Sequence, residues 1–498
     1  MRRKDAVLLG ALGAGVLSLS ASLAGRFVLD IDDANLALGI ERFDVRMHQP
    51  HPPGYLGYVM LLRLVHALSG LSLLDVPRWT ARGFALLTIY FAWRAAKAFG
   101  ADEVRARWSA LLCATNPIIL YYAVDGQTHA AEAAMSAALV WALANPNPLV
   151  VGALVAAGGS FRPTYLLLSA VAVAWAFRGR RLVCVAALAG AGTLAWLVPT
   201  VILTGGWASY RAANDALVGG LVKQFSLLSS TGDARYIALN LRDALAWSVI
   251  ALAPLVLLQR SVDRRAAILC GAIVIPSLLF YTLVICAEAG YLAGLVAPAA
   301  VLGALASRRR WLPPLLAAAQ LGFFLFGPQQ LGRTFMLPDV SEIVDRDVRT
   351  TLLFDALHRE APPEARVLVV SDFPDLTVMR QLPLVRPATE ILFVHDKAWF
   401  PAGGESWISY ATAHGWWAAP GIVLRNDGDD ARIRSHTSYD LIALDPRASE
   451  PLRDALRTQT RCPVASRSQA EARVAQRWPR SCFGESLRFF DRVFELTR

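Results

Sequence analysis

Residues 30–58 read DIDDANLALGIERFDVRMHQPHPPGYLGY and decide the fold, because they place acidic residues directly after a long apolar run. That run, Ala6 to Leu29, is long enough to cross a bilayer as one helix. Charged groups are costly to keep at the edge of a bilayer, so we treat these acidic residues as candidate functional residues and not as part of an ordinary loop. The stretch predicts chemistry at a membrane surface.

The composition of the whole chain agrees with a membrane protein. Of 498 residues, 55% are hydrophobic and only 18% are charged, a balance that does not fit an ordinary soluble domain. The first apolar run follows three basic residues, as in a signal peptide, but many more apolar runs come after it, so we expect a retained helix. The net charge of +10 comes from short basic clusters between these runs, which indicates membrane orientation and not nucleic acid binding.

The apolar runs predict about 11 membrane-spanning helices. They cover residues 6–29, 79–99, 107–123, 127–144, 149–161, 163–177, 182–203, 244–259, 266–286, 290–306 and 311–327. The segment from Tyr55 to Leu74 is also apolar, but it contains Arg63 and His66 and follows a Pro-Pro-Gly break, so we expect a re-entrant or interfacial helix. The predicted fold class is a polytopic α-helical membrane protein with interfacial helices in its first outer loop, residues 30–78.

The basic clusters predict the orientation. They are Arg2/Arg3/Lys4, Arg94/Lys97/Arg105/Arg107, Arg178/Arg180/Arg181, Arg260/Arg264/Arg265 and Arg308/Arg309/Arg310. If the segment 55–74 does not cross, all of them fall on one face, which the positive-inside rule makes cytoplasmic. The N-terminus is then cytoplasmic, the membrane is the inner (plasma) membrane, and the acidic groups after the first helix lie on the extracytoplasmic face.

Residues 328–498 have the composition of a soluble domain. Strand-like runs at Arg366 to Val370, Gly421 to Leu424 and Tyr439 to Leu444 alternate with turn signals, which indicates a mixed α/β fold. An odd number of crossings places this domain on the extracytoplasmic face, and its role is not evident from the sequence. Cys462 and Cys482 lie in its polar part and can form a disulfide in an oxidising compartment.

The first group of candidate catalytic residues combines carboxylates and imidazoles in one outer loop. Its members are Asp30, Asp32, Asp33, Asp44, His48 and His51. A carboxylate held among others gains proton affinity, which suits a general base near neutral pH. The alternative is a solvated acidic loop beside the end of a helix.

The second group is Asp125, His129 and Glu132. Their spacing of four and then three residues places them on one face of one helix, with Glu132 about two turns into the apolar zone. An unpaired carboxylate there is expensive, so either a site or an internal polar pair that packs helices explains the pattern. Asp, His and Glu also bind divalent metals such as Mg or Mn, although the spacing matches no structural zinc pattern.

The third group centres on Arg162 in the sequence GGSFRPTYLL, between two short apolar runs. An arginine at this position can hold a phosphate through two parallel hydrogen bonds, and the glycines let a ligand approach the backbone. The alternative is an arginine that extends to the membrane interface. Glu288 and Tyr291 in CAEAGYL form a similar but weaker candidate.

Five stretches of the sequence resemble the GT-C membrane glycosyltransferases. They are DDANLALGIERFD, HQPHPPGYLGYV, YYAVDGQTHAAEA, GGSFRPTYLLL and AGYLAGLVAP. More narrowly, they look like a bacterial branch of dolichyl-phosphate-mannose-protein mannosyltransferase-like proteins. The resemblance covers residues 1–327, which would form the transmembrane catalytic domain, whereas residues 328–498 resemble no family that we can name.

The resemblance implies a hexosyl- or pentosyltransferase that takes a sugar from a polyprenyl-phosphate donor in the bilayer. The acceptor would be a glycan, a lipid or a protein on the extracytoplasmic face, and transfer would invert the sugar. By this resemblance Asp32 is the general base, Asp33 is its nearest substitute, and Glu132 or Asp125 is a second acidic residue. Arg162 and Tyr291 would bind the lipid phosphate.

Two other functions also fit many helices with polar residues at one mouth. A transporter or flippase would more often show paired interrupted helices and charges near mid-membrane, which the sequence does not show. A non-enzymatic scaffold would use the C-terminal domain to bind a partner. The sequence contains no Gly-rich nucleotide loop, which agrees with a lipid-phosphate donor; no cofactor is required, although a divalent metal remains an option.

Overall fold

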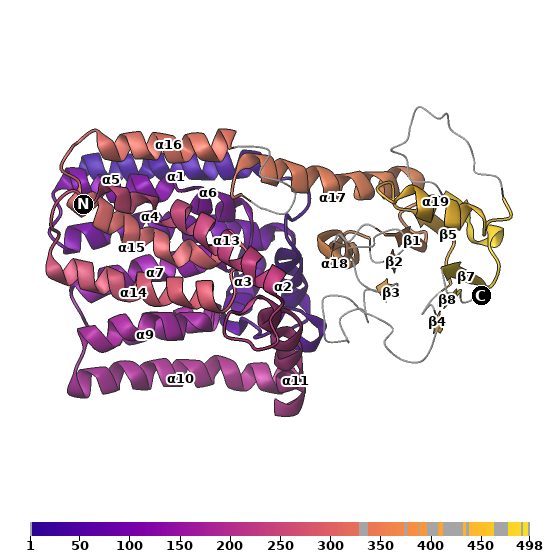
Figure 1. The fold of residues 1–498 in the computed structure, drawn as a ribbon, viewed down its shortest axis with the longest axis horizontal. Helices are drawn as coiled ribbons and strands as arrows, with labels where there is room; N and C mark the ends of the chain where they lie inside the picture. Colours follow the sequence, from indigo (N-terminus) through magenta and orange to yellow (C-terminus); the bar gives the residue numbers. More distant parts are fainter. Residues whose placement is uncertain are drawn as a thin grey trace. The chain divides into compact units, whose positions relative to one another are not determined.

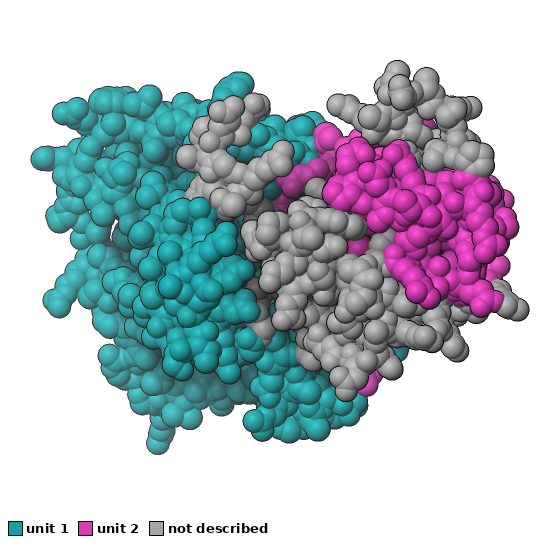
Figure 2. All heavy atoms as spheres, turned by 45° about the vertical axis from the view of Figure 1, so that its right-hand side comes forward, with its two compact units in different colours: residues 1–25, 36–45, 49–345 teal, residues 26–35, 46–48, 346–498 magenta. Residues whose placement is uncertain are grey.

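The computed structural model describes residues 2–327, 337–372, 376–386, 388–395, 407–411, 432–434, 438–462, 477–489 and 492–496. Its contacts divide the chain into two compact units (Figure 2). Unit 1 comprises residues 1–25, 36–45 and 49–345, and unit 2 comprises residues 26–35, 46–48 and 346–498. The first residues of the predicted outer loop thus belong to the same unit as the C-terminal residues.

Unit 1 consists of helices that lie side by side (Figure 1). Its elements are α1 (Arg3–Leu23), α3 (Leu56–Ser69), α4 (Asp75–Ala98), α5 (Glu103–Ala114), α6 (Pro117–Val124), α7 (His129–Ala144), α8 (Pro148–Phe161), α9 (Thr164–Ala176), α10 (Gly179–Leu203), α11 (Trp207–Leu217), η2 (Val218–Val222), α12 (Lys223–Phe225), α13 (Ala234–Leu252), η3 (Ala253–Leu257), α14 (Arg264–Leu283), η4 (Ala289–Leu292), α15 (Ala293–Ala306) and α16 (Leu312–Phe326). Helices α2 (Ile31–Glu41) and α17 (Val340–Glu360) each contribute to both units.

Several of these helices suit a membrane. Five described segments are long and apolar enough to cross it by length and composition: Arg3–Leu23, Gly179–Leu203, Ala234–Leu257, Arg264–Leu283 and Ala289–Ala306. Shorter apolar helices of 10–17 residues accompany them, among them α7, α8, α9 and α16. The protein is a multi-pass α-helical membrane protein, as the composition predicts.

A predicted segment differs from the structure. Residues 107–123 do not form one helix, because the chain breaks between α5 and α6. The Asn116 side chain there accepts a hydrogen bond from the Ile118 amide (3.1 Å), and Pro117 occupies the first turn of α6, where no N–H is needed. Residues 204–243, which separate two predicted membrane-spanning helices, contain α11 and the start of α13.

Helices α7 and α15 form the centre of unit 1. Every residue of α15 is buried, and in α7 every residue except the partly exposed Trp141 is buried. Both helices are rich in alanine, and small side chains allow helix backbones to approach closely in a membrane. The Ser136 hydroxyl donates to the Gly294 carbonyl oxygen (2.7 Å), which fixes the two helices against each other.

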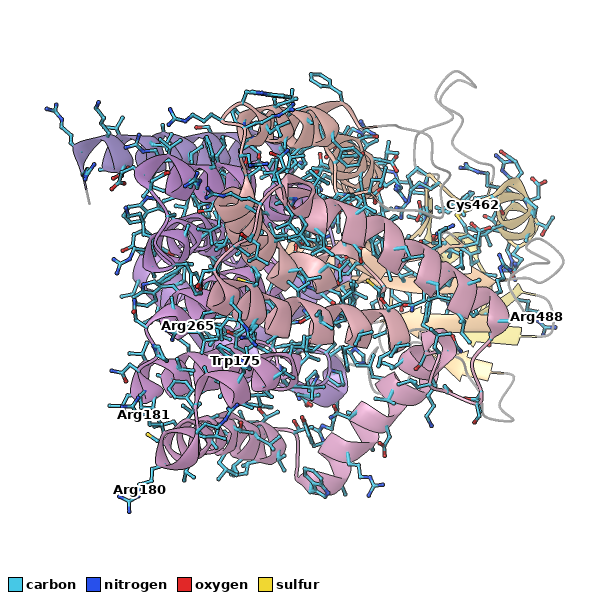
Figure 3. All side chains as sticks on the ribbon, turned by 60° about the vertical axis from the view of Figure 1, so that its left-hand side comes forward. Trp175, Arg180, Arg181, Arg265, Cys462 and Arg488 are labelled. Atoms are coloured by element: carbon cyan, nitrogen blue, oxygen red, sulfur yellow. A yellow bond between two sulfur atoms is a disulfide. The ribbon has the colours of Figure 1, made fainter. Side chains whose placement is uncertain are left out.

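The basic clusters gather at one end of unit 1, called here the basic end. Arg107 and Asp5 form an ion pair (2.8 Å), so the starts of α1 and α5 lie together. Arg265 donates to the Leu143 carbonyl oxygen (3.1 Å), which brings together the start of α14 and the end of α7. Figure 3 shows three labelled arginines at this end of the helices: Arg180, Arg181 and Arg265.

The segment 55–74 does not carry the chain across unit 1. Helix α3 begins against the end of α8, where a Cβ on Gly57 would lie 2.2 Å from the Ser160 hydroxyl. Helix α4 begins against the turn before α7, where a Cβ on Gly126 would lie 2.5 Å from Pro77. Both helices therefore begin at the end of unit 1 opposite the basic end, as expected for an interfacial or re-entrant segment.

Unit 2 contains two β-sheets. The larger has the strand order β3-β2-β1-β5-β6, with β1 (Val367–Ser371), β2 (Thr389–His395), β3 (Trp407–Ala411), β5 (Leu441–Leu444) and β6 (Arg477–Pro479). Strand β1 pairs in parallel with β2 and β5, whereas β3 and β6 pair antiparallel at the edges. The smaller has the order β4-β8-β7, with β4 (Arg432–Arg434), β7 (Ser486–Phe489) and β8 (Arg492–Glu495).

Alternating side chains of the larger sheet enter two different cores. Leu368 and Val370 of β1 lie in the core that includes α19 (Glu450–Arg457), whereas Val367 and Val369 lie in the core with α17 and α18 (Leu376–Val385). This alternation follows from the pleat, and the apolar run Val367–Val370 of β1 is typical of a parallel strand covered on both faces.

The predicted α/β fold of the C-terminal residues is correct. The runs 366–370 and 439–444 correspond to β1 and β5, whereas 421–424 lies outside the described residues. Cys462 forms a disulfide with Cys482, which lies in η6 (Arg480–Cys482); their Cα atoms are 5.3 Å apart, within the normal range for a disulfide.

Candidate active site

A carboxylate at the start of η4 collects three donors in unit 1. Glu288 accepts hydrogen bonds from the Tyr122 hydroxyl (3.1 Å) and from Nε2 of Gln127 (3.1 Å). Nε2 of His129 lies 2.8 Å from its other oxygen. Gln127 also donates to Asp125 (3.1 Å), so a single amide joins two carboxylates. The Glu288 side chain is 19% exposed, whereas His129 is 1% exposed, so the carboxylate is the accessible part of this cluster.

A second buried group in unit 1 contains Arg162, the arginine that the sequence predicts as a candidate site residue. Nε of Arg162 lies 2.8 Å from Oε2 of Glu132, and both side chains are at least nine-tenths buried. Nη1 of Arg162 donates to the Thr128 hydroxyl (3.1 Å), and Tyr281 donates to Glu132 (3.4 Å). The guanidinium lies over the Tyr291 ring, 4.8 Å from its centroid. Arg162 is therefore held on several sides, and the alternative of an arginine extended to the interface is wrong.

Tyr291 joins these two groups into one cluster, called here the α7 cluster. Its ring centroid lies 5.5 Å from that of His129 and 5.1 Å from that of Tyr281. Glycine is needed next to it, because a Cβ on Gly290 would lie 2.3 Å from the His129 ring and 2.6 Å from Tyr122. The α7 cluster lies where α6, α8 and α14 end and where α7, α9 and α15 begin, opposite the basic end.

The predicted common helical face of Asp125, His129 and Glu132 is wrong for Asp125. Helix α6 ends at Val124, and Asp125 has an extended backbone before α7 begins at His129. Close packing of Gly126 against α4 breaks the helix at this point. His129 and Glu132 do share the first turn of α7, so Glu132 lies at the mouth of this helix and not two turns inside it.

In unit 2, the acidic residues at the start of the stretch 30–58 lie at the beginning of helix α2. Oδ1 of Asp30 accepts a hydrogen bond from the Asp32 amide (3.0 Å), which is a helix-capping contact. Oδ2 of Asp30 forms an ion pair with Arg346 of α17 (2.8 Å). Asp32 and Asp33 occupy the first turn of α2, where the helix dipole favours negative charge. Asp32 is partly exposed and Asp33 is buried, and both lie within a helix and not in a loop.

The remaining predicted residues of this stretch shape its turns. The backbones of Asp44 and Gln49 exchange two hydrogen bonds (2.8 and 3.0 Å) around η1 (Val45–Met47). His51 lies 2.9 Å from the Tyr55 hydroxyl through Nε2. His48 has a positive φ of 52° and belongs to unit 2 with the start of α2. Asp44 and His51 belong to unit 1, whereas Asp32 belongs to unit 2.

The described residues offer no ready site for the divalent metal, Mg or Mn, that the sequence left as an option. Within the part of the chain that the structure describes, no three His, Cys, Asp or Glu side chains lie together in a way that could hold a metal ion. His129 and Glu132 each have a protein partner instead, namely Glu288 and Arg162. No step of the reaction considered below uses a metal.

Sequence reasoning missed Arg380 in unit 2. Its Nε donates to Oδ1 of Asn35 (2.6 Å), and its Nη2 donates to the carbonyl oxygens of Met47 and His48 (2.9 Å each). The available signal was an arginine within the otherwise apolar run LTVMRQLPLV. Its partners lie more than 330 positions away in the sequence, so the sequence offered no means to pair them.

The helices and the small α/β unit define a GT-C fold, the fold that the sequence resembles. The chain is similar to ArnT from Cupriavidus metallidurans in a crystal structure bound to undecaprenyl phosphate, with a TM-score of 0.58 and 14% identity, covering 97% of this chain and 100% of ArnT. The apo structure of the same protein matches with a TM-score of 0.58 and 14% identity, at 97% and 99% coverage.

The apo oligosaccharyltransferase of Archaeoglobus fulgidus matches with a TM-score of 0.39 and 11% identity, covering 76% of this chain and 64% of that protein. No family model matches the sequence, and no curated protein matches it.

Proposed function

We propose that this protein transfers a sugar from a polyprenyl-phosphate donor to an acceptor hydroxyl, as a hexosyl- or pentosyltransferase. The observation that carries the proposal is the likeness along almost the whole chain to ArnT, a protein whose crystal structure was determined with undecaprenyl phosphate. It extends over both units, so the C-terminal residues are included. The acidic start of α2 and the buried arginine of the α7 cluster supply groups suited to this chemistry.

In the proposed reaction Asp32 is the general base, with Asp33 as its nearest substitute. The carboxylate accepts the proton of the acceptor hydroxyl while the hydroxyl oxygen attacks the anomeric carbon. The bond from this carbon to the phosphate oxygen breaks, and polyprenyl phosphate leaves with the bonding electrons. A single displacement inverts the anomeric centre. Proton transfer to one positioned carboxylate contributes about 10²- to 10⁴-fold to the rate.

We propose Arg162 and Tyr291 as the residues that bind the phosphate of the lipid. A guanidinium can stabilise the charge that develops on a departing phosphate, and it carries five N–H donors. The contacts with Glu132 and Thr128 use only part of this capacity and fix the orientation of the group. Arg162→Lys should therefore raise the KM for the lipid donor, because a lysine cannot offer the same planar set of donors.

Two features support an orientation with the N-terminus in the cytoplasm and the C-terminal residues outside, in the inner (plasma) membrane. The basic clusters gather at one end of unit 1, as the positive-inside rule requires of a cytoplasmic face. Unit 2 contains the Cys462–Cys482 disulfide, a bond that persists in oxidising compartments. Residues 1–327 would then act in the membrane, and residues 328–498 would act beyond it.

The proposal is tested by transfer of labelled sugar from polyprenyl-phosphate donors into a membrane extract of the host. Wild type is compared with Asp32→Asn at equal membrane levels and with Asp215→Asn, whose carboxylate is exposed and paired with Arg211. We expect Asp32→Asn to abolish transfer while the protein still folds, and Asp215→Asn to retain it. Near-normal transfer by Asp32→Asn would overturn the assignment of the base.

The same assay separates the alternatives. If folded wild-type protein transfers no sugar from any donor, a transporter, a flippase or a scaffold becomes the better explanation. A scaffold would also keep its partner binding in the Asp32→Asn variant, because a bound partner does not need a general base. The sugar and the acceptor would be identified from the labelled product.

A further inference from the structure

We propose that Arg380 is a positioning residue for Asp32, so that the C-terminal sequence completes the catalytic acidic stretch. The inference rests on the proposed role of Asp32 as general base. Arg380 and Asp32 both belong to unit 2, as do Asn35, Met47 and His48, to which Arg380 is hydrogen-bonded. It assigns a function to the C-terminal residues, for which the sequence indicated none.

Arg380 is a buried cation on α18. It is 2% exposed, and all three of its described hydrogen bonds go to the stretch that contains the acidic motif: to Asn35, Met47 and His48. A charged group is costly to bury unless it is paired or hydrogen-bonded, and the rigid guanidinium fixes the direction of each bond. The start of α2 and the η1 turn are therefore held by one side chain.

Asn35 passes this restraint to Asp32. Its Oδ1 accepts the bond from Arg380 (2.6 Å), and its Nδ2 donates to Oδ1 of Asp32 (3.2 Å). The two ends of an amide have different hydrogen-bonding roles, so the arginine determines which end faces the carboxylate. The order Arg380, Asn35, Asp32 thus orients the Asp32 carboxylate.

Arg380 also supplies charge. Burial lowers the pKa of its guanidinium, and the negative charge of Asp32 acts in the opposite direction. An arginine stays protonated at physiological pH even when it is buried, so the positive charge is permanent. A permanent positive charge nearby favours the ionised form of a carboxylic acid, which is the form that a general base needs.

Other titratable groups lie around the start of α2. They are Asp30 before α2, Asp33 on α2, Arg346 on α17 and His48 next to η1. Asp30 is paired with Arg346 (2.8 Å). The Asp33 carboxylate is buried and follows Asp32 in the sequence.

The residue after Arg380 holds the chain that leads into α2. The Gln381 amide accepts a hydrogen bond from the Val28 N–H (2.9 Å) and donates to the Val28 carbonyl oxygen (3.1 Å). Two consecutive side chains of α18 therefore contact the acidic stretch on both sides of its first aspartate. This arrangement favours a positioning role over an isolated structural contact.

The test measures the protonation of Asp32 without relying on transfer. A water-soluble carbodiimide modifies protonated carboxyl groups, and mass spectrometry of the peptide 27–42 reports modification at Asp32 as a function of pH. The full-length protein in detergent is compared with Arg380→Met, Arg380→Lys and Asn35→Ala. Asp32→Asn identifies the signal that belongs to this residue.

Arg386→Met is the matched control. Arg386 directly follows α18, and its guanidinium donates to the carbonyl oxygens of Leu357 (2.7 Å), Ala361 (3.3 Å) and Pro362 (2.6 Å). It makes a similar number of bonds in the same unit and touches no part of the acidic stretch in the described contacts. Its loss should disturb the fold of unit 2 locally and leave the Asp32 labelling curve unchanged.

We expect Arg380→Met to shift the labelling curve of Asp32 upward by about one pH unit. Asn35→Ala should shift it in the same direction, and Arg380→Lys should stay near wild type because the charge remains. If Arg380→Met does not fold, Asn35→Ala and Arg380→Lys decide the result. Coincident curves for wild type and Asn35→Ala, or for wild type and Arg380→Met, would overturn the inference.

Failure of this inference can be told from failure of the proposed function. In an active enzyme, the acid limb of kcat/KM should move with the labelling curve in Arg380→Met and should not move in Arg386→Met. An unmoved curve with transfer that still requires Asp32 overturns the positioning role alone. A shifted curve in a protein that transfers no sugar overturns the proposed function alone.

Discussion

Nε of Arg162 lies 2.8 Å from Oε2 of Glu132, and neither side chain is more than 7% exposed. The two residues come from the end of α8 and the first turn of α7, so the ion pair ties together two short apolar helices. Removing one partner leaves a buried charge without its counterion, which is far more costly than losing an exposed pair.

We expect Arg162→Met to destabilise the protein by about 3 to 5 kcal/mol and the double variant Arg162→Met/Glu132→Gln to recover most of this loss. Thermal unfolding of the detergent-solubilised protein, followed by tryptophan fluorescence, measures the change. Arg211→Ala is the control, because the Arg211–Asp215 pair (3.3 Å) is 70% and 68% exposed; it should change stability by about 0 to 1 kcal/mol. A double variant less stable than Arg162→Met would contradict the prediction.

Gly290→Ala tests the close packing around Glu288. The added methyl group would lie 2.3 Å from the His129 ring, so one of the two must move. We expect a loss of about 1 to 3 kcal/mol from overpacking, together with loss of the His129–Glu288 contact. Gly322→Ala on α16 is the control, since nothing lies within 4 Å of the added atom. Equal unfolding temperatures for the two variants would show that the packing at Gly290 is not tight.

Two aspartates of unit 2 predict opposite effects of pH on stability. Burial raises the pKa of the Asp372 carboxyl, and hydrogen bonds from Ser449 offset this only in part. Hydrogen bonds from Arg366 lower the pKa of Asp440. The raised pKa of Asp372 stabilises the fold at pH values below the unfolded pKa of about 4, and this stabilisation is lost as pH rises through the folded pKa. The lowered pKa of Asp440 stabilises the fold at pH values above about 4, and this stabilisation is lost as pH falls through the folded pKa.

Over the range from about pH 2 to 7, Asp372→Asn should therefore become more stable relative to wild type as pH rises above about 4, and Asp440→Asn should become less stable relative to wild type as pH rises toward about 4 from below. Unfolding temperatures across this range, measured on the same preparations, give the two slopes. Slopes of the same sign would contradict the assignment of at least one pKa.

The disulfide predicts both stability and sidedness. Replacing Cys462 and Cys482 together by serine should destabilise unit 2 by about 3 kcal/mol, because the bond closes a loop of about 20 residues. Cys184→Ser is the control, since Cys184 is a free cysteine of unit 1. Peptide mapping without reductant should find the linked pair in wild-type protein.

After reduction, a maleimide that cannot cross the membrane containing the protein should label the two cysteines when it is added from outside. The cells used must let the reagent reach the outer face of that membrane. Labelling only in inside-out vesicles would contradict the proposed orientation.

The periodic and local features of this protein were predictable from its sequence. Long apolar runs predicted most of the helices, and apolar strands flanked by turns predicted β1 and β5, because both signals depend on neighbours in the chain. The basic clusters also predicted which helix ends lie together. The break at Asn116 was missed because an apolar run continues through it.

The candidate site residues were predictable only where they are neighbours in the sequence. Sequence spacing identified His129 and Glu132, but it assigned Asp125 to their helix because the close approach of Gly126 to α4 is a tertiary effect. Glu288 looked secondary in the sequence, although it accepts bonds from three side chains that belong to α6, α7 and the turn between them. Arg380 stood out only as an arginine in a largely apolar run, and its partners could not be identified because they lie near the other end of the chain.

The pairing of Gln381 with Val28 sets an order of events during synthesis. The two residues are 353 positions apart, and translation proceeds at about 5 to 20 residues per second, so Val28 leaves the ribosome about 20 to 70 s before its partner is made. Throughout that interval the nascent chain carries its acidic stretch without the α18 contacts. A chain that ends before α18 therefore reaches the membrane without the contacts of Arg380 and Gln381, which can form only after residue 381 has been translated.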